Sequence, residues 1–228
     1  MGRAFVLSLA KEGGLVALSD IPTREKEGQE VVSHVEAMGG KSIWVPLDVT
    51  KEEAWKAAVS DGVLGVLANN AGIVTPYDAT AVQPEQISLA EFHKSTSIMI
   101  DGALLGHKEW SSIVNISAKA GMVGGVGTLG YGTSKWALRG STKYMAGTLP
   151  AAGIRARVNS VLGLVDQNSD DVIGEMCNAL ANMNYLKRSA GPEKVANLVV
   201  YLASDGSSFS TGSEFWWMEG GNDSASCR

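Results

Sequence analysis

Short apolar runs alternate with longer segments of helical periodicity along this sequence, and this alternation restricts the fold more than any other feature. Apolar residues recur every three to four positions in the helical segments, whereas the short runs are continuously apolar. Strands of that kind are buried on both faces, as in a parallel sheet that helices cover. The sequence therefore predicts an α/β fold with a doubly wound parallel sheet. The predicted strands are 15–19, 42–47, 63–68, 112–116, 155–161 and 214–218, and the predicted helices are 3–12, 23–38, a short helix capped by Thr50, 89–105, 131–149 and 191–203.

Length, charge and cysteine usage narrow the class of protein. The chain has 228 residues, which suits a single domain, 1–228, able to bury a core without a metal or a disulfide. The net charge is −5 and no basic stripe occurs, so we expect no nucleic acid partner. Cys177 and Cys227 match neither a disulfide framework nor metal-ligand spacing, and we expect no metal. No apolar stretch reaches the ~18 residues of a membrane span, which predicts a soluble, cytoplasmic protein with no membrane partner.

Glycine is unusually frequent, at 27 of the 228 residues, and it lies between the apolar runs rather than in low-complexity tracts. This placement predicts tight turns between strands and helices. Gly13-Gly14 and Gly39-Gly40 follow the first two predicted helices, where a glycine C-cap is expected.

Polar residues follow several of the predicted strands, at the edge where a doubly wound sheet binds its ligands. Asp20 lies 18 residues after Gly2, close to the ~20 residues between a phosphate-binding glycine and a ribose-binding carboxylate. A carboxylate in that position accepts hydrogen bonds from ribose hydroxyls and repels a 2′-phosphate, which favours NAD over NADP. An aspartate that follows a strand is, taken alone, more often a turn residue. The other strand-end segments are 48–49, 69–72, 117 and 161–163.

Tyr131 and Lys135 form a Tyr-x-x-x-Lys motif in the long predicted helix. Residues four apart share one face of a helix. A phenol has an ordinary pKa near 10 and serves as an acid or base at neutral pH only where a cation stabilises the phenolate. The motif is common by chance, so it becomes informative only in combination with the other motifs of the chain.

The motifs in their order resemble the short-chain dehydrogenase/reductase family, in its single-domain form. The resemblance covers nearly the whole chain and implies a Rossmann-like fold. It further implies an NAD(H)-dependent enzyme that interconverts a secondary alcohol and a ketone, with a hydroxysteroid, cyclic alcohol or similar apolar carbinol as substrate and a homo-oligomer, dimer or tetramer, as assembly. The motifs are Asp20, Leu47-Asp48-Val49-Thr50, Asn69-Asn70-Ala71-Gly72, Ile113-Val114-Asn115-Ile116-Ser117, Tyr131-x-x-x-Lys135 and Arg157-Val158-Asn159-Ser160-Val161.

The resemblance also assigns roles to individual residues. It makes Tyr131 the group that exchanges a proton with the substrate oxygen, Lys135 its partner and a ligand of the nicotinamide ribose, and Ser117 the third catalytic residue. The cofactor-binding residues that it implies are Gly2, Asp20, Asp48, Val49, Asn70, Ala71, Gly72, Tyr131, Lys135 and Val165.

The beginning of the chain departs from the family pattern. Gly2 resembles the last glycine of the phosphate-binding loop, so the usual first strand and most of that loop are missing from the sequence given. If no residues are omitted, we expect the strand at Leu15 to pair directly with the strand at Val63, because the alternative, an empty central slot, would leave buried backbone groups unpaired. Segments 60–63 and 106–112 are also short, through trimming or through omitted residues, and omission would stretch a Cα–Cα step beyond the usual ~3.8 Å.

Three departures lie at catalytic positions. The family serine precedes the tyrosine by about 13 residues, which falls on Ala118, while Ser117 points to the opposite face unless the strand end twists. Met99 stands where the family has an asparagine, and Leu162-Gly163 replaces a Pro-Gly. These differences keep open an alternative function, a catalytically impaired dehydrogenase-like protein that acts as a binding or scaffold module.

Overall fold

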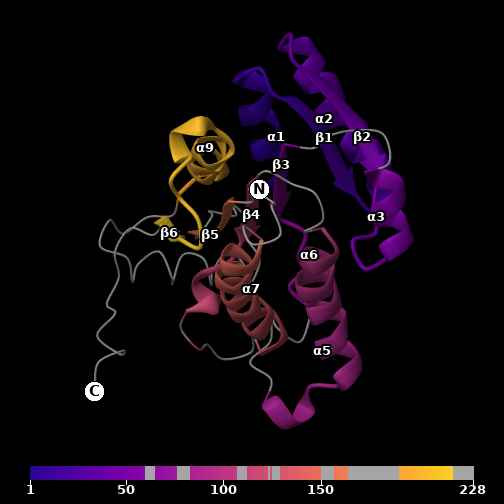
Figure 1. Ribbon diagram of the computed structural model, residues 1–228. Helices are drawn as coiled ribbons and strands as arrows, with labels where there is room; N and C mark the ends of the chain where they lie inside the picture. Colours follow the sequence, from indigo (N-terminus) through magenta and orange to yellow (C-terminus); the bar gives the residue numbers. More distant parts are fainter. Residues whose placement is uncertain are drawn as a thin grey trace.

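The computed structural model describes residues 1–59, 65–75, 83–106, 112–122, 124, 129–149, 157–163 and 190–217 (Figure 1). The strands are β1 (Leu15–Asp20), β2 (Lys41–Pro46), β3 (Val66–Asn69), β4 (Ser112–Ile116), β5 (Arg157–Gly163) and β6 (Glu214–Trp217). The helices are α1 (Gly2–Lys11), α2 (Glu25–Ala37), α3 (Glu52–Ala58), α5 (Leu89–Thr96), α6 (Gly102–Leu105), α7 (Leu129–Thr148) and α9 (Pro192–Ala203), with shorter turns η1 (Pro22–Arg24), η2 (Pro84–Gln86), η4 (Lys119–Gly121) and η6 (Asp205–Ser207). The predicted alternation of strands and helices is confirmed.

Local signals set most of the element ends. Gly13 and Gly39 have φ values of 85° and 80° and follow α1 and α2, as expected for glycine C-caps. Pro192 opens α9, where a missing amide hydrogen costs nothing. Ser88 caps α5 by accepting a hydrogen bond from the backbone of Glu91.

Two predicted helices differ from expectation. Thr50 does not cap α3: its backbone amide and its hydroxyl both donate to Asp48, and Lys51 occupies the N-cap without a side-chain hydrogen bond. The segment predicted as one helix over 89–105 is interrupted by a π-helical turn, η3 (Ser97–Asp101), between α5 and α6. The spacing of apolar residues does not reveal such a turn, because a π-helical turn shifts the buried face of the helix by only a single residue.

All described strand pairs are parallel, but they form two sheets rather than one. The first contains β1 and β2, and the second has the order β3-β4-β5-β6. The predicted pairing of β1 with the third strand is wrong, since no ladder joins β1 to β3 in the described chain. Most residues of β1 are exposed, with Leu15 at 80%, whereas the expectation assumed that this strand would be buried.

Helix α1 connects the two sheets through its side chains. Phe5 packs with Val114 and Ile116 of β4 and with the apolar face of α9. Val6 and Ala10 pack against Val31 and Val35 of α2 and against β1. Figure 1 shows α1 and α9 together above β3 to β6, and α5 and α7 side by side below these strands. This arrangement replaces the predicted strand pairing as the link between the sheets.

The two sheets place several of the predicted site residues at the carboxyl ends of their strands. Ligands of doubly wound folds bind beyond the carboxyl ends of the strands, near the point where the strand order reverses. Here the reversal falls between the β1-β2 pair and the sheet that starts with β3. The residues at or just after the carboxyl ends of β1, β3 and β4 are Asp20, Asn69, Asn70 and Ser117. The segments 60–63 and 106–112, in which omitted residues would stretch a Cα–Cα step, lie largely outside the described residues.

Candidate active site

Tyr131 and Lys135 lie on one face of α7, as the motif predicts. Lys135 is buried, with 4% of its surface exposed, and its Nζ lies 5.4 Å from the ring centroid of Tyr131. The ammonium donates to the carbonyl of Ile116 at 2.7 Å. Burial lowers the pKa of Lys135 to about 8, because a charged group loses hydration there. The lysine is therefore still mostly protonated at pH 7, and its charge lies over the ring of Tyr131.

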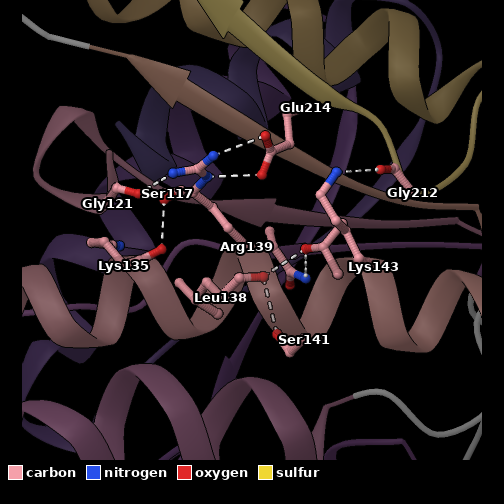
Figure 2. A network of polar contacts seen from close by, with 11 residues as sticks. Ser117, Gly121, Lys135, Leu138, Arg139, Ser141, Lys143, Gly212 and Glu214 are labelled. Carbon is pink, nitrogen blue, oxygen red and sulfur yellow. Dashed lines mark hydrogen bonds and ion pairs between the residues drawn. The ribbon is translucent and has the colours of Figure 1, made fainter. Parts of the chain in front are cut away.

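Ser117 is also buried, and its hydroxyl faces α7. Its Oγ donates to the backbone carbonyl of Lys135 at 2.9 Å (Figure 2). Ala118 follows with an extended backbone and carries no polar group. A role for Ser117 at the substrate oxygen stays a prediction, and it requires that the hydroxyl exchange this partner for the substrate.

The segment after β3 reaches the tyrosine-lysine pair. A Cβ built on Gly72 would lie 3.1 Å from Sδ of Met99 and 3.6 Å from Nζ of Lys135. Met99 is 1% exposed and sits in the η3 turn. A thioether is only a weak acceptor and has no proton to pass on. The position where the family has an asparagine is therefore packed against the site but contributes no proton relay.

Gly2 and Asn70 meet at the start of α1. A Cβ on Gly2 would lie 3.2 Å from Nδ2 of Asn70. Met1 is the N-cap of α1 and makes no side-chain hydrogen bond there. The first amides of a helix without such a cap favour an anion such as a phosphate. The structure thus brings together two predicted cofactor residues, Gly2 and Asn70, next to a helix N-terminus.

Asp20, Asp48 and Val49 lie around the carboxyl ends of β1 and β2. The carbonyl of Asp20 accepts the amide of Leu47 at 2.8 Å, and its exposed carboxylate accepts the amide of Ile21. Hydrogen bonds from the hydroxyl and then the amide of Thr50 lower the pKa of Asp48. Val49 packs against Gly102 of α6. Asp48 and Val49 are anchored by this turn, while Asp20 presents a carboxylate to solvent. The predicted cofactor residue Val165 lies outside the described residues.

A buried chain of polar side chains joins β3, β4 and α7, and sequence reasoning did not assign it. Asn69 donates to Asn115 at 2.8 Å, and Asn115 donates to the hydroxyl of Thr142 at 2.9 Å. Thr142 in turn donates to the carbonyl of Leu138. An asparagine inside an apolar strand was the available signal, because a buried amide needs partners. This chain sets the position of α7 relative to the strand ends.

The described residues fit a nicotinamide cofactor. Within the described chain, the Lys135 ammonium donates to one protein acceptor, Ile116, although an ammonium has three donors. A buried ammonium with spare donors suits a ribose hydroxyl, the N-terminus of α1 suits a pyrophosphate, and the Asp20 carboxylate suits a second ribose. Each of the three groups has the donor or acceptor character that its part of the cofactor needs.

Comparisons with known proteins show which family the chain resembles. A family model described as enoyl-(acyl carrier protein) reductase matches residues 1–222. A 3-alpha-(or 20-beta)-hydroxysteroid dehydrogenase of Mycobacterium tuberculosis is 37% identical, over 94% of this chain and 82% of the relative. A cyclopentanol dehydrogenase of Comamonas testosteroni is 34% identical, over 94% of this chain and 89% of the relative. The crystal structure of NAD+-bound xylitol dehydrogenase matches with a TM-score of 0.84 at 25% identity, covering 96% of this chain and 94% of that one.

The chain therefore belongs to the short-chain dehydrogenase/reductase family of oxidoreductases. Enzymes of this family use nicotinamide cofactors, and the family predicted from the motifs is confirmed. Among the described helices, none is long and apolar enough to cross a membrane. The described residues also contain no group of three or more His, Cys, Asp or Glu side chains placed to hold a metal ion.

Proposed function

We propose that this protein is an NAD(H)-dependent oxidoreductase that interconverts a secondary alcohol and a ketone. The observation that carries the proposal is the buried Lys135 ammonium, 5.4 Å from the ring centroid of Tyr131. The names of the relatives, hydroxysteroid and cyclopentanol dehydrogenases, support the substrate class. We extend that class to an apolar carbinol, either a steroid or a cyclic alcohol.

The chain's own residues handle the proton. A nicotinamide cofactor, which Lys135, Asp20 and the N-terminus of α1 would hold, would supply the hydride acceptor for oxidation of the carbinol carbon and the hydride donor for reduction of the ketone. During oxidation the Tyr131 phenolate takes the hydroxyl proton of the alcohol, and during reduction the phenol gives that proton to the developing alkoxide. Lys135 stabilises the phenolate through its charge, and its burial keeps water from screening that charge. Ser117 contributes to substrate orientation if its hydroxyl leaves the Lys135 carbonyl.

The preference for NAD rests on Asp20. Its carboxylate is exposed at the end of β1, where it would repel the 2′-phosphate of NADP. Asp20→Ala should weaken NADH binding, because the ribose hydroxyls lose their acceptor, and should raise the relative affinity for NADPH, because the repulsion is removed. Equal affinity of the unmutated protein for NADH and NADPH would contradict this assignment.

We also propose a homo-oligomer, a dimer or a tetramer, in the cytoplasm. Exposed apolar side chains on the helices below the strands support an assembly: Leu89 is 74% exposed, Leu104 61% and Leu129 46%. Light scattering coupled to size exclusion measures the assembly directly, and a monomer at assay concentration would contradict it.

A second candidate is a dehydrogenase-like binding or scaffold protein. Ala118 and Met99, which carry no group that donates or relays a proton, favour it. The deciding experiment titrates the protein with NADH and follows energy transfer from its six tryptophans, then assays oxidation of cyclopentanol and of a hydroxysteroid with NAD. Saturable binding with turnover supports the enzyme. Absence of turnover with both substrate types, whether or not NADH binds, supports the second candidate.

A further inference from the structure

Arg139 lies one turn after Lys135 on α7 and contacts two distant parts of the chain. Its Nε and Nη2 donate to the two carboxylate oxygens of Glu214 at 2.8 and 3.0 Å, and its Nη1 donates to the carbonyl of Gly121 (Figure 2). The Arg139 and Glu214 side chains are 16% and 11% exposed. A bidentate pair between arginine and a carboxylate fixes the plane of the guanidinium as well as its position.

Gly121 connects this arginine to the candidate active site. It ends the η4 turn, which begins just after Ser117 and Ala118. A Cβ on Gly121 would lie 2.7 Å from Oγ of Ser117 and 2.8 Å from the carbonyl carbon and oxygen of Lys135. The turn therefore rests directly on the backbone of the catalytic lysine. Ile116 is the last residue of β4, directly before Ser117, and its carbonyl accepts a hydrogen bond from the Lys135 ammonium.

We propose that Arg139 is a positioning residue for the tyrosine-lysine pair. It binds the Gly121 carbonyl and so holds the 117–121 turn against α7, which keeps the Lys135 ammonium directed at Tyr131. Glu214, at the start of β6, orients the guanidinium and joins this arrangement to the edge of the sheet. The inference rests on the proposed function of Tyr131 and Lys135.

The first test compares Arg139→Met with Lys143→Met. Lys143 is a matched control, because it lies on the same helix and its exposed ammonium also reaches the lead-in to β6, at Gly212 (3.4 Å). We expect Arg139→Met to lower kcat for cyclopentanol about 10-fold, since small displacements of catalytic groups are costly, and to raise the Kd for NADH by a smaller factor, because the same ammonium is proposed to bind the cofactor ribose. Lys143→Met should change neither quantity. Equal kcat in the two variants would overturn the inference.

A charge-swapped double variant, Arg139→Glu with Glu214→Arg, separates positioning from stability. It restores an ion pair between α7 and β6, but a carboxylate at position 139 has no hydrogen to donate to the Gly121 carbonyl. We expect the thermal unfolding midpoint of the double variant to match that of the wild type. Its kcat should stay as low as that of Arg139→Met. Recovery of kcat together with stability would show that the pair is only structural, and would overturn the inference.

A readout independent of turnover is the titration of the Tyr131 phenol. Ultraviolet absorbance reports phenolate, and subtracting the curve of Tyr131→Phe isolates this residue from the other four of the five tyrosines. We expect its midpoint to rise in Arg139→Met, because the ammonium is held less closely, and not in Lys143→Met. An unchanged midpoint would overturn the positioning role. If Arg139→Met does not fold, Arg139→Leu, which also has no donor for the Gly121 carbonyl, takes its place with the same expectations.

These measurements separate the inference from the proposed function. If Tyr131→Phe retains turnover, the proton-transfer role proposed for Tyr131 fails, and the inference fails with it because the pair being positioned is then not catalytic. If Tyr131→Phe loses turnover while Arg139→Met retains it, the inference alone fails.

Discussion

At the scale of single residues, the site depends on the ring of Tyr131, which lies 5.4 Å from the buried Lys135 ammonium. Tyr131→Phe keeps this ring and removes only the phenol oxygen. We expect kcat to fall at least ~10²-fold, the lower range for a positioned acid or base, while the Kd for NADH stays unchanged. Tyr144→Phe is the matched control, because Tyr144 lies on the same helix and is 82% exposed. Turnover retained in Tyr131→Phe would assign the proton transfer to another group.

Lys135 makes a separate prediction about stability and pH. Burial lowers its pKa from 10.5 to about 8 in the folded state, so between these values the unfolded chain binds more protons than the folded chain. The contribution of this group to the free energy of unfolding therefore rises as the pH rises from 8 to 10.5. Lys135→Met removes that dependence. The stability of the wild type relative to the variant should increase across this window, by at most about 3 kcal/mol.

Urea unfolding of both proteins at several pH values measures this difference. A difference in the free energy of unfolding that is flat between pH 8 and 10.5, or that falls, would show that the lysine is not desolvated as described. Below pH 8 the difference should be constant, because both the folded and the unfolded lysine are then protonated.

At the scale of secondary structure elements, the hydrogen bond between Asn115 of β4 and Thr142 of α7 positions α7, the helix that carries Tyr131 and Lys135. Thr142→Val keeps the shape of the side chain but leaves the buried Asn115 amide without its acceptor. We expect a loss of about 1–3 kcal/mol in the free energy of unfolding, the cost of an unsatisfied buried group. Thr148→Val is the control, since Thr148 makes the same kind of hydrogen bond to a carbonyl one turn back, but is exposed. Equal losses in the two variants would contradict the role of Asn115.

Elements with strong local signals could be predicted from the sequence, and those set by distant contacts could not. Strand β4 has its predicted bounds, and α9 begins at its proline, because apolar runs and caps are local features. The η3 turn, the partner of Ser117 and the Arg139–Glu214 pair depend on packing between segments far apart in the chain. The motif Tyr131-x-x-x-Lys135 predicted the shared face because a helix alone determines it.

At the scale of the whole molecule, α1 connects the two sheets. This structural role is separate from the candidate phosphate-binding role of its N-terminus. One of its faces packs on β4 and α9, and the other packs on β1 and α2. The residues that flank the candidate cofactor site, Asp20 on one sheet and Asn70 and Ser117 on the other, therefore keep their relative positions through this helix. Any loss of its packing should loosen the two-stranded sheet from the rest of the fold.

Phe5→Ala tests this connection. Phe5 is 3% exposed within the cluster that includes Val114 and Ile116, and its truncation should cost about 3–5 kcal/mol, a large part of the ~5–15 kcal/mol by which domains are stable. We expect hydrogen exchange to accelerate more at the β1-β2 ladder than at the β3-β4 ladder, because β4 keeps its own packing against α9. Leu15→Ala, at a side chain 80% exposed on β1, is the control and should change exchange little. Uniform acceleration across both ladders would mean that the two sheets unfold as one cooperative unit, and that α1 is part of a common core rather than a connection between separate ones.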